Sequence, residues 1–361
     1  MVRFFRLVLF FLLPIASLSA QNNPAQQSFS GDSSTSNPQP SPSARQITLD
    51  VQVTDGSGAP VRGLQPQDFT LQDGQKPQSI VSFHAFEGAP AAGADAPAEL
   101  VLVIDAVNAP YQILTTERNE VTKFLLQNGG KLALPVELVF FAAAGTKLQD
   151  RFSRDGNALA SLYDQSASGL VPNNLSATER FDLSIKTLGS LAAHESKRPG
   201  RKLMVWISPG WPLLSGGNLQ LTPKDFQWLF DSTVVLTGAL HDARITLYDV
   251  DPLGVMNSGG TRLTYYQEFL KPATAPRKMQ PGYLSLQVFA VQSGGRVFNS
   301  TNDLTKAIAD CAADADSFYV LSFNTPPAET PNQYHALGVS VDKPANTVRT
   351  RSGYYTSPGI R

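Results

Sequence analysis

The first regular pattern in the chain is an alternation of apolar and polar residues. Over residues 47–54 every second side chain is apolar: Ile47, Leu49, Val51 and Val53. Such alternation is typical of a strand with one face buried. Further along, Asp73-Gly74 separates two short apolar stretches, which predicts a hairpin. We therefore expect a small β unit over residues 47–87.

The middle of the chain has a different pattern, in which short apolar runs are continuous. These runs are residues 100–104, 136–142, 203–207, 245–248, 297–298 and 318–323. A continuous run fits a strand buried on both faces of a parallel sheet. Helically spaced apolar residues separate the runs, with helix-start signals at Ser176 and at Thr222-Pro223. Residues 98–325 are thus predicted to form an α/β fold, a doubly wound and mostly parallel sheet flanked by helices.

Alternation returns near the end of the chain, where Leu337, Val339 and Val341 are apolar. Neither this segment, residues 330–361, nor the N-terminal β unit has enough strands to be stable alone. We expect the two to pair and form one β-sandwich-like unit.

Residues 1–20 have the order of a secretory signal peptide: positive charge, an apolar run and then small residues. The cleavage site is predicted after Ala20, with Ser19 as an alternative. Residues 21–46 are rich in Gln, Asn, Ser and Pro, which predicts a disordered linker. The apolar run is too short to span a membrane, and no later segment is long and apolar enough. The sequence therefore predicts export, to the periplasm or the medium, without an integral membrane span.

Composition narrows the functional classes. The chain is 42% hydrophobic and 16% charged, as expected for a globular protein. A formal net charge of −1 argues against nucleic-acid binding, which needs a concentrated basic surface. The single cysteine, Cys311, excludes an intrachain disulfide. Its place on an apolar helical stripe predicts a buried structural thiol.

Signals for catalysis are weak. The four histidines are His84, His194, His241 and His335. They are far apart in the sequence and lack the spacing of zinc ligands, so the sequence gives a zinc site little support. The chain has no nucleophile-elbow motif and no Walker motif. Asp249 and Asp251 could act as acid and base, but a solvated turn after a strand is expected. Trp206 and Trp228 are predicted to pack in the core, whereas Trp211 fits either packing or anchoring a partner.

Motifs in four places resemble one known family. Two of them come at predicted strand ends, Leu102-Val103-Ile104-Asp105 and Ile207-Ser208-Pro209-Gly210. A leader-like segment contains Asp73-Gly74-Gln75-Lys76-Pro77-Gln78-Ser79-Ile80, and the last motif is Arg351-Ser352-Gly353-Tyr354-Tyr355. In this order, over residues 47–356, the motifs resemble the von Willebrand factor A-related proteins of the acidobacterial type. The resemblance implies a von Willebrand A-like fold and a role in protein–protein interaction.

The resemblance also implies a site at the carboxyl end of the sheet. The family's metal-ion-dependent adhesion site consists of an Asp-x-Ser-x-Ser turn, a threonine and a second aspartate. Asp105 matches the first aspartate and Thr178 the threonine. Residues without a side-chain oxygen stand in place of the other three ligands: Val107, Ala109 and Pro209. Because Mg²⁺ demands near-octahedral oxygen coordination, we expect neither a metal nor another cofactor.

The first hypothesis is therefore an exported binding or adhesion module that contacts an unidentified protein without metal. Its predicted binding face is the degenerate adhesion site: Asp105, Asn108, Thr178, Ser208 and Trp211. A structural component of an envelope assembly is the second hypothesis. A hydrolase with an unrecognised site is the third, although we expect the protein not to be an enzyme.

Overall fold

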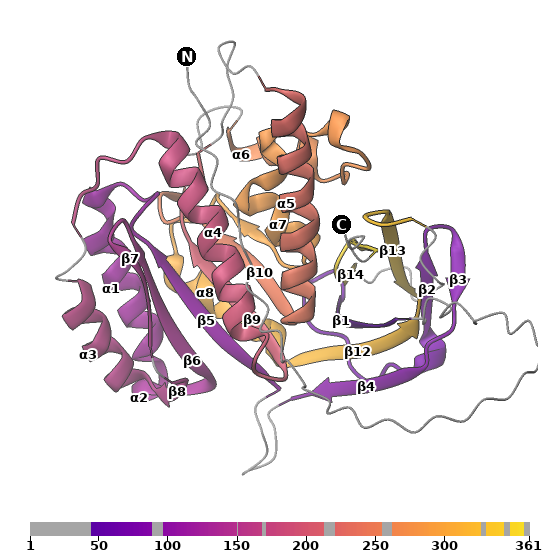
Figure 1. Ribbon diagram of the computed structural model, residues 1–361. Coiled ribbons are helices and arrows are strands. Elements are labelled where there is room, and N and C mark those ends of the chain that lie inside the picture. Colours follow the sequence, from indigo (N-terminus) through magenta and orange to yellow (C-terminus); the bar gives the residue numbers. More distant parts are fainter. Residues whose placement is uncertain are drawn as a thin grey trace, which may run out of the picture.

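The computed structural model describes residues 45–88, 97–149, 151–167, 171–212, 221–254, 262–325, 330–342 and 347–356. The predicted signal peptide and residues 21–44 of the predicted linker lie outside these ranges. Figure 1 shows a body in which helices cover a sheet, with a smaller β part beside it.

The body is built on a seven-stranded, mostly parallel sheet with the order β11-β10-β9-β5-β6-β7, in which β8 also pairs with β6. Its parallel strands are β5 (Ala98–Asp105), β6 (Lys131–Ala142), β9 (Arg201–Ile207), β10 (Ile245–Val250) and β11 (Val297–Phe298). Two short antiparallel strands, β7 (Gly145–Leu148) and β8 (Ser153–Asp155), complete one edge.

Helices cover both faces of this sheet (Figure 1). One face packs against α1 (Leu114–Leu125), α3 (Gly156–Ala167) and α8 (Leu304–Ala312), and α2 (Gln127–Gly130) lies between α1 and β6. The other face packs against α4 (Ala177–Glu195), α5 (Pro223–Asp242) and α7 (Leu286–Gln292). Within β5, Leu102 faces the first group of helices and Val103 the second. Burial on both faces explains why the run is continuously apolar.

The predicted helix starts are confirmed. Ser176 and Glu179 form a reciprocal capping box at the start of α4. Thr222 and Asp225 do the same for α5, with Pro223 at its first position. The body also contains α6 (Arg262–Tyr265) and short 3-10 helices: η2 (Tyr111–Ile113), η4 (Tyr266–Phe269), η5 (Pro276–Lys278), η6 (Pro281–Leu284) and η7 (Ala313–Ala315). In the part of the chain that the structure describes, no helix is long and apolar enough to cross a membrane.

The β unit consists of two four-stranded sheets. One has the order β14-β1-β12-β4, formed by β1 (Gln46–Thr54), β4 (Ser82–Glu87), β12 (Ser317–Asn324) and β14 (Thr347–Arg349). The other has the order β15-β13-β2-β3, formed by β2 (Phe69–Asp73), β3 (Lys76–Gln78), β13 (Tyr334–Val341) and β15 (Gly353–Tyr355), and η1 (Pro66–Asp68) precedes β2. N- and C-terminal segments therefore share both sheets, as the alternation predicts, and Asp73 of β2 links them by bonding His335 and Tyr354.

The structure corrects the sheet to which one predicted strand belongs. The strand predicted at residues 318–323 exists as β12, but it pairs with β1 and β4 of the β unit and not with the parallel sheet. β12 is buried on both faces, because Tyr319, Leu321 and Phe323 join the core of the β unit while Phe318 packs against Arg201 of β9, and its apolar run therefore resembles that of a parallel strand.

Buried polar and aromatic groups join the β unit to the body. Asp314 of η7 accepts hydrogen bonds from Arg349 of β14 at 2.8 Å and from the Tyr248 hydroxyl of β10 at 2.6 Å. Tyr355 of β15 packs edgewise on Phe230 of α5, with 6.0 Å between ring centroids. The two parts are thus held together by an ion pair and by a shared apolar contact.

Candidate binding site at the carboxyl end of the sheet

Asp105 is the last residue of β5, and it is completely buried. Its Oδ1 accepts hydrogen bonds from the backbone N–H groups of Val107 at 3.0 Å and Asn108 at 2.8 Å. Its Oδ2 accepts from the Asn108 side-chain amide at 2.8 Å and from the Trp206 indole at 2.9 Å. A carboxylate offers about four lone-pair positions, so protein donors occupy the acceptor capacity of Asp105.

Burial changes the pKa values of two carboxyl groups at this end of the sheet. Burial raises the pKa of Asp105, while hydrogen bonds from Asn108, Trp206 and Ser208 oppose that rise. Glu117 of α1 is also buried, and among the described residues neither of its carboxyl oxygens has a hydrogen-bond partner. Burial and the charge of Asp105 hold the pKa of Glu117 well above its usual value. Burial and the neighbouring carboxylate thus both favour the protonated form of Glu117.

The turn after Asp105 is anchored to α4 through Asn108 and Asn173. The Asn108 amide donates to the Ser184 hydroxyl at 2.9 Å. Asn173, which precedes α4, donates to the backbone carbonyls of Ala106 and Val107 at 3.2 and 3.3 Å. Val107 and Ala109, which stand where the resemblance implied serines, are buried in the two apolar cores on either side of the sheet.

The remaining predicted site residues are near this turn, but they differ in exposure. Thr178 is half-buried in the first turn of α4. Ser208 is buried, and its hydroxyl accepts from the Gly210 backbone N–H at 3.2 Å. The Trp211 ring is 2% exposed and packs edgewise on Trp206, with ring centroids 5.4 Å apart. Of the five predicted face residues, only Thr178 is therefore partly accessible in this structure.

Sequence reasoning missed the roles of Trp206, Ser184 and Asn173. Trp206 is confirmed as a buried residue, yet it also donates the indole hydrogen bond that helps to fix Asp105. Parallel pairing of β5 and β9 places Trp206 opposite Val103, two positions from Asp105. A tryptophan within a buried strand needs a hydrogen-bond acceptor for its indole N–H. This requirement could have indicated from the sequence that Trp206 bonds a polar group such as Asp105.

Three further predictions can be compared with the structure. Asp249 and Asp251 are buried, so the predicted solvated turn is wrong; β10 extends to Val250, and Asp249 accepts from Gln287 at 2.8 Å. Trp228 is 38% exposed, so the predicted core position is also wrong, because it lies outside the buried stripe of α5. Cys311 is fully buried as predicted, and burial raises the pKa of its thiol.

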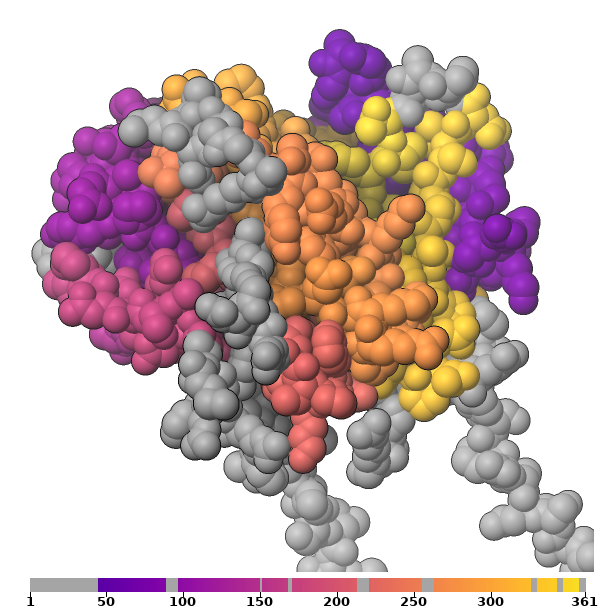
Figure 2. Space-filling model, turned by 90° about the horizontal axis from the view of Figure 1, so that it is seen from above, coloured from indigo at the N-terminus to yellow at the C-terminus, as the bar shows by residue number. Residues whose placement is uncertain are grey.

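Three exposed apolar side chains lie in η2, shortly before α4 and near the start of α5. Tyr111, at the start of η2, is 50% exposed, and Val171, shortly before α4, is 65% exposed. Trp228 is in the second turn of α5. Figure 2 shows the molecule from this end, with α4 among the pink atoms and α5 among the red atoms. We call these three residues, Tyr111, Val171 and Trp228, the rim.

A separate polar cluster lies near the start of β9. Glu137, His194 and Glu195 bring possible metal-ligating atoms within 4.8 Å of one another. Arg198 already bonds Glu195 at 2.8 Å and Glu137 at 3.3 Å, so a guanidinium supplies the positive charge that a metal would supply. The wide spacing of the histidines in the sequence gave no sign of this cluster.

Comparisons with known proteins leave the family open. No protein-family model matches the chain, and no curated protein matches it. Among solved structures, the pilus adhesin SpaC from Lactobacillus rhamnosus GG in its open conformation is 10% identical over 82% of this chain and 49% of its own, with a TM-score of 0.38. This chain thus spans about half the length of SpaC.

Two other solved structures show a similar degree of likeness. The PilB minor pilin from Streptococcus sanguinis is 12% identical over 63% of each chain, with a TM-score of 0.38. The von Willebrand factor type A protein from Catenulispora acidiphila is 8% identical over 88% of this chain and 75% of its own, with a TM-score of 0.32. At such values the likeness assigns neither a family nor a function to this chain.

Proposed function

We propose that this chain is an exported, non-enzymatic binding module of the von Willebrand A-like type that holds a partner protein without a divalent metal. The partner would contact the carboxyl end of the sheet. The observation that carries the proposal is the saturation of Asp105, whose carboxylate is buried and bonded to four protein donors. A metal ion would have to displace these donors, and few further oxygen ligands stand nearby to compensate.

Because Asp105 is buried and hydrogen-bonded within the protein, the partner would bind the rim instead. Exposed aromatic side chains supply large contact areas at low entropic cost, and tryptophan and tyrosine are enriched among residues that dominate binding energy. The buried residues beneath the rim, Asn108, Ser208 and Trp211, would then shape the loops rather than touch the partner. Fixing those loops in advance lowers the ordering cost of binding.

A capture experiment with matched variants tests this function. The mature chain is immobilised and exposed to an envelope extract, and captured proteins are identified by mass spectrometry with Mg²⁺ or with EDTA. The rim variant carries Tyr111→Ser, Val171→Ser and Trp228→Ser. The control variant changes three exposed apolar residues elsewhere: Val81, Leu126 and Val235, each to Ser. We expect the native chain and the control to capture one protein equally in both media, and the rim variant to lose it.

Two results would contradict the proposal. Capture that EDTA abolishes would indicate a metal-dependent contact, with Asp105 rearranged to reach the ion. Equal capture by the rim and control variants would place the contact elsewhere, for example on the β unit, and would favour the structural role in an envelope assembly.

A further inference from the structure

A cluster of charged side chains lies near the amino end of the parallel sheet, beneath the end of α4. Glu99 of β5 and Lys202 of β9 are partners in the parallel pairing. Glu137 comes from β6, Glu195 is the last residue of α4, and Arg198 follows in the connection to β9. The Glu137 and Glu195 side chains are fully buried, and that of Arg198 is 30% exposed. The end of α4 therefore covers charged groups from three strands of the sheet.

The carboxyl groups of this cluster outnumber its cations. Arg198 Nη2 donates to both oxygens of Glu195, at 2.8 and 2.9 Å, and to Glu137 Oε2 at 3.3 Å. Lys202 Nζ donates to three backbone carbonyls of the connection after α4. Glu99 is the third carboxyl group, and its charge interacts with those of Arg198 and Lys202. With every group ionised, three carboxylates would face two cations and leave one net negative charge.

A hydrogen is missing between two of these carboxyl groups. Among the described residues, no hydrogen-bond partner is found for the buried Glu137 Oε1. An oxygen of Glu137 and an oxygen of Glu195 lie within 4.8 Å of each other. Two carboxylates at this distance repel, and neither can donate a hydrogen bond to the other. A proton on one of them removes the repulsion and supplies the donor.

The electrostatics of Glu137 agree with this geometry. Burial, followed by the charge of Glu195, raises the pKa of Glu137 to about 7, and a hydrogen bond to Glu195 acts in the same direction. The positive charge of Arg198 opposes the rise. Glu137 therefore holds the proton below neutral pH, and Glu195 accepts the hydrogen bond.

We propose that Glu137 and Glu195 share one proton, and that this carboxyl–carboxylate hydrogen bond is a pH-sensitive contact that fastens the end of α4 to β6. When the pH rises above neutral, the proton passes to water and leaves two carboxylates with one guanidinium between them. β6 is held between β5 and β7, so the end of α4 and residues 196–200 are the parts that move away. The contact thus opens at alkaline pH.

Two other titratable groups face the pair. His194 brings a ring nitrogen within the same 4.8 Å, but it is exposed. Burial raises the pKa of Glu99, and the charges of Arg198 and Lys202 oppose that rise. Among the described residues, Glu99 Oε2 also lacks a hydrogen-bond partner. Glu99 is therefore the alternative holder of the proton, and its glutamine variant is the matched control.

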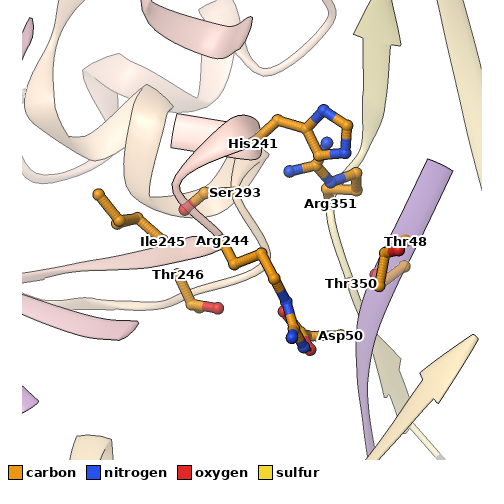
Figure 3. Close-up of a pocket in the computed structure, with 9 residues that line it drawn as sticks. All are labelled: Thr48, Asp50, His241, Arg244, Ile245, Thr246, Ser293, Thr350 and Arg351. Carbon is orange, nitrogen blue, oxygen red and sulfur yellow. The ribbon is translucent and has the colours of Figure 1, made fainter. Parts of the chain in front are cut away.

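A small polar pocket beside Arg351, where the β unit meets the body, has the contrasting arrangement (Figure 3). There one carboxylate faces one guanidinium, because Arg244 forms an ion pair with Asp50. His241 lines the same pocket, and burial, followed by the charge of Arg351, lowers its pKa to about 2. His241 is therefore neutral from pH 6 to pH 9 and adds nothing to a pH response in that range.

Infrared spectroscopy tests where the proton is. A protonated carboxyl group has a C=O stretching band at higher frequency than the bands of carboxylates. Between pH 6 and pH 8 we expect the native chain to lose one such band, with a midpoint at about pH 7. Glu137→Gln should remove this change, whereas Glu99→Gln should retain it. A change that persists in Glu137→Gln, or that Glu99→Gln removes, would overturn the proposal.

Hydrogen exchange tests the opening in the native chain, whether or not the variants fold. After correction for the intrinsic pH dependence, amides of residues 192–200 should exchange roughly tenfold faster at pH 9 than at pH 6, since one pKa unit corresponds to a factor of ten. Amides at the end of α5 serve as the internal control. Glu137→Gln keeps an uncharged N–H donor toward Glu195 and should abolish the difference, and His194→Gln should retain it. Equal exchange at both pH values in the native chain would overturn the proposal.

Discussion

The buried carboxyl groups of this protein differ in the hydrogen-bond donors and charges that surround them. Asp105 is bonded by neutral donors, including the Trp206 indole, and these hydrogen bonds oppose the rise in its pKa that burial causes. Glu117 has no hydrogen-bond partner among the described residues, so protonation is its less costly form. Glu137 is buried beside Glu195, and burial followed by the charge of Glu195 raises its pKa to about 7. Residue type alone therefore does not predict the ionisation state.

Replacing Asp105 should destabilise the protein whether or not metal is present. Asp105→Ala leaves the Trp206 indole without its acceptor and removes one of the two acceptors of the Asn108 amide, and each hydrogen bond to a charged group contributes about 1.5–3 kcal/mol. We expect melting temperatures of the native chain to coincide in millimolar Mg²⁺, in Mn²⁺ and in EDTA. Asp105→Ala should melt several degrees lower in all three. A saturable rise with Mg²⁺ that vanished in the variant would instead revive a metal-dependent site.

Because of Glu137, the free energy of unfolding should decrease as the pH rises from about 4.5 to 7. In this window the folded chain keeps the proton on Glu137, because its pKa is about 7, while the unfolded chain has lost it. Stability from this group is complete below the unfolded pKa and decreases by up to about 1.4 kcal/mol per pH unit as the pH rises. Glu137→Gln should flatten that dependence in denaturant titrations, whereas Glu268→Gln, at an exposed position, should not. Parallel pH profiles for the native chain and Glu137→Gln would contradict this.

At the scale of elements, one side chain in a short 3-10 helix connects strands from both parts of the molecule. Asp314 of η7 accepts from Arg349 of β14 and from Tyr248 of β10. Its backbone carbonyl accepts from Arg201 of β9 at 2.9 Å, and also from Gln52 of β1. Because η7 immediately precedes β12, this junction fixes the point where the chain leaves the body and enters the β unit.

Asp314→Ala should therefore be strongly destabilising. Removal of one partner of a buried ion pair leaves Arg349 uncompensated and costs about 3–5 kcal/mol. Asp310→Ala is the matched control, since Asp310 pairs with Lys306 on the exposed surface of α8, and such pairs contribute about 0–1 kcal/mol. Urea unfolding measures both changes. A loss for Asp314→Ala no larger than that for Asp310→Ala would show that the junction adds little.

At the scale of the whole molecule, the first and the last described strands, β1 and β15, belong to the same β unit, and the body lies between them in the sequence. β13 pairs with β2, and β14 pairs with β1. β12, which follows the last helices of the body, is central in the first sheet. Several strands of the β unit therefore follow the body in the sequence. The unit is held together by contacts between residues that are far apart along the chain.

Deletion of residues 330–361 should loosen the N-terminal strands. Without the C-terminal strands, β1 and β2 each lose a neighbour and expose an apolar face, and isolated short sheets are marginally stable. Hydrogen exchange in residues 47–83 should become markedly faster. Amides of α1 and α3, on the far side of the body, serve as the internal control. Unchanged exchange in residues 47–83 would show that the N-terminal segment folds independently.

Local sequence patterns determined the element types and much of the architecture. Continuous apolar runs predicted the parallel strands because both faces of β5 are buried, and capping residues predicted where α4 and α5 begin. Alternation predicted the strands shared by the two ends of the chain. These signals depend on residues close in sequence, whose spacing reflects the periods of helix and strand. Asp105 could be recognised as a strand-end residue for the same reason.

Tertiary structure alone decided which sheet β12 joins, that Asp249 is buried and that Trp228 is exposed. It also decided that the acceptor positions of Asp105 are filled from within, because the Trp206 indole comes from another strand, 101 residues away. The pocket beside Arg351 likewise combines groups from both ends of the chain with groups from α5 and β10. Burial and hydrogen-bond partners depend on which distant segments meet in space, and the spacing of residues along the chain does not encode that choice.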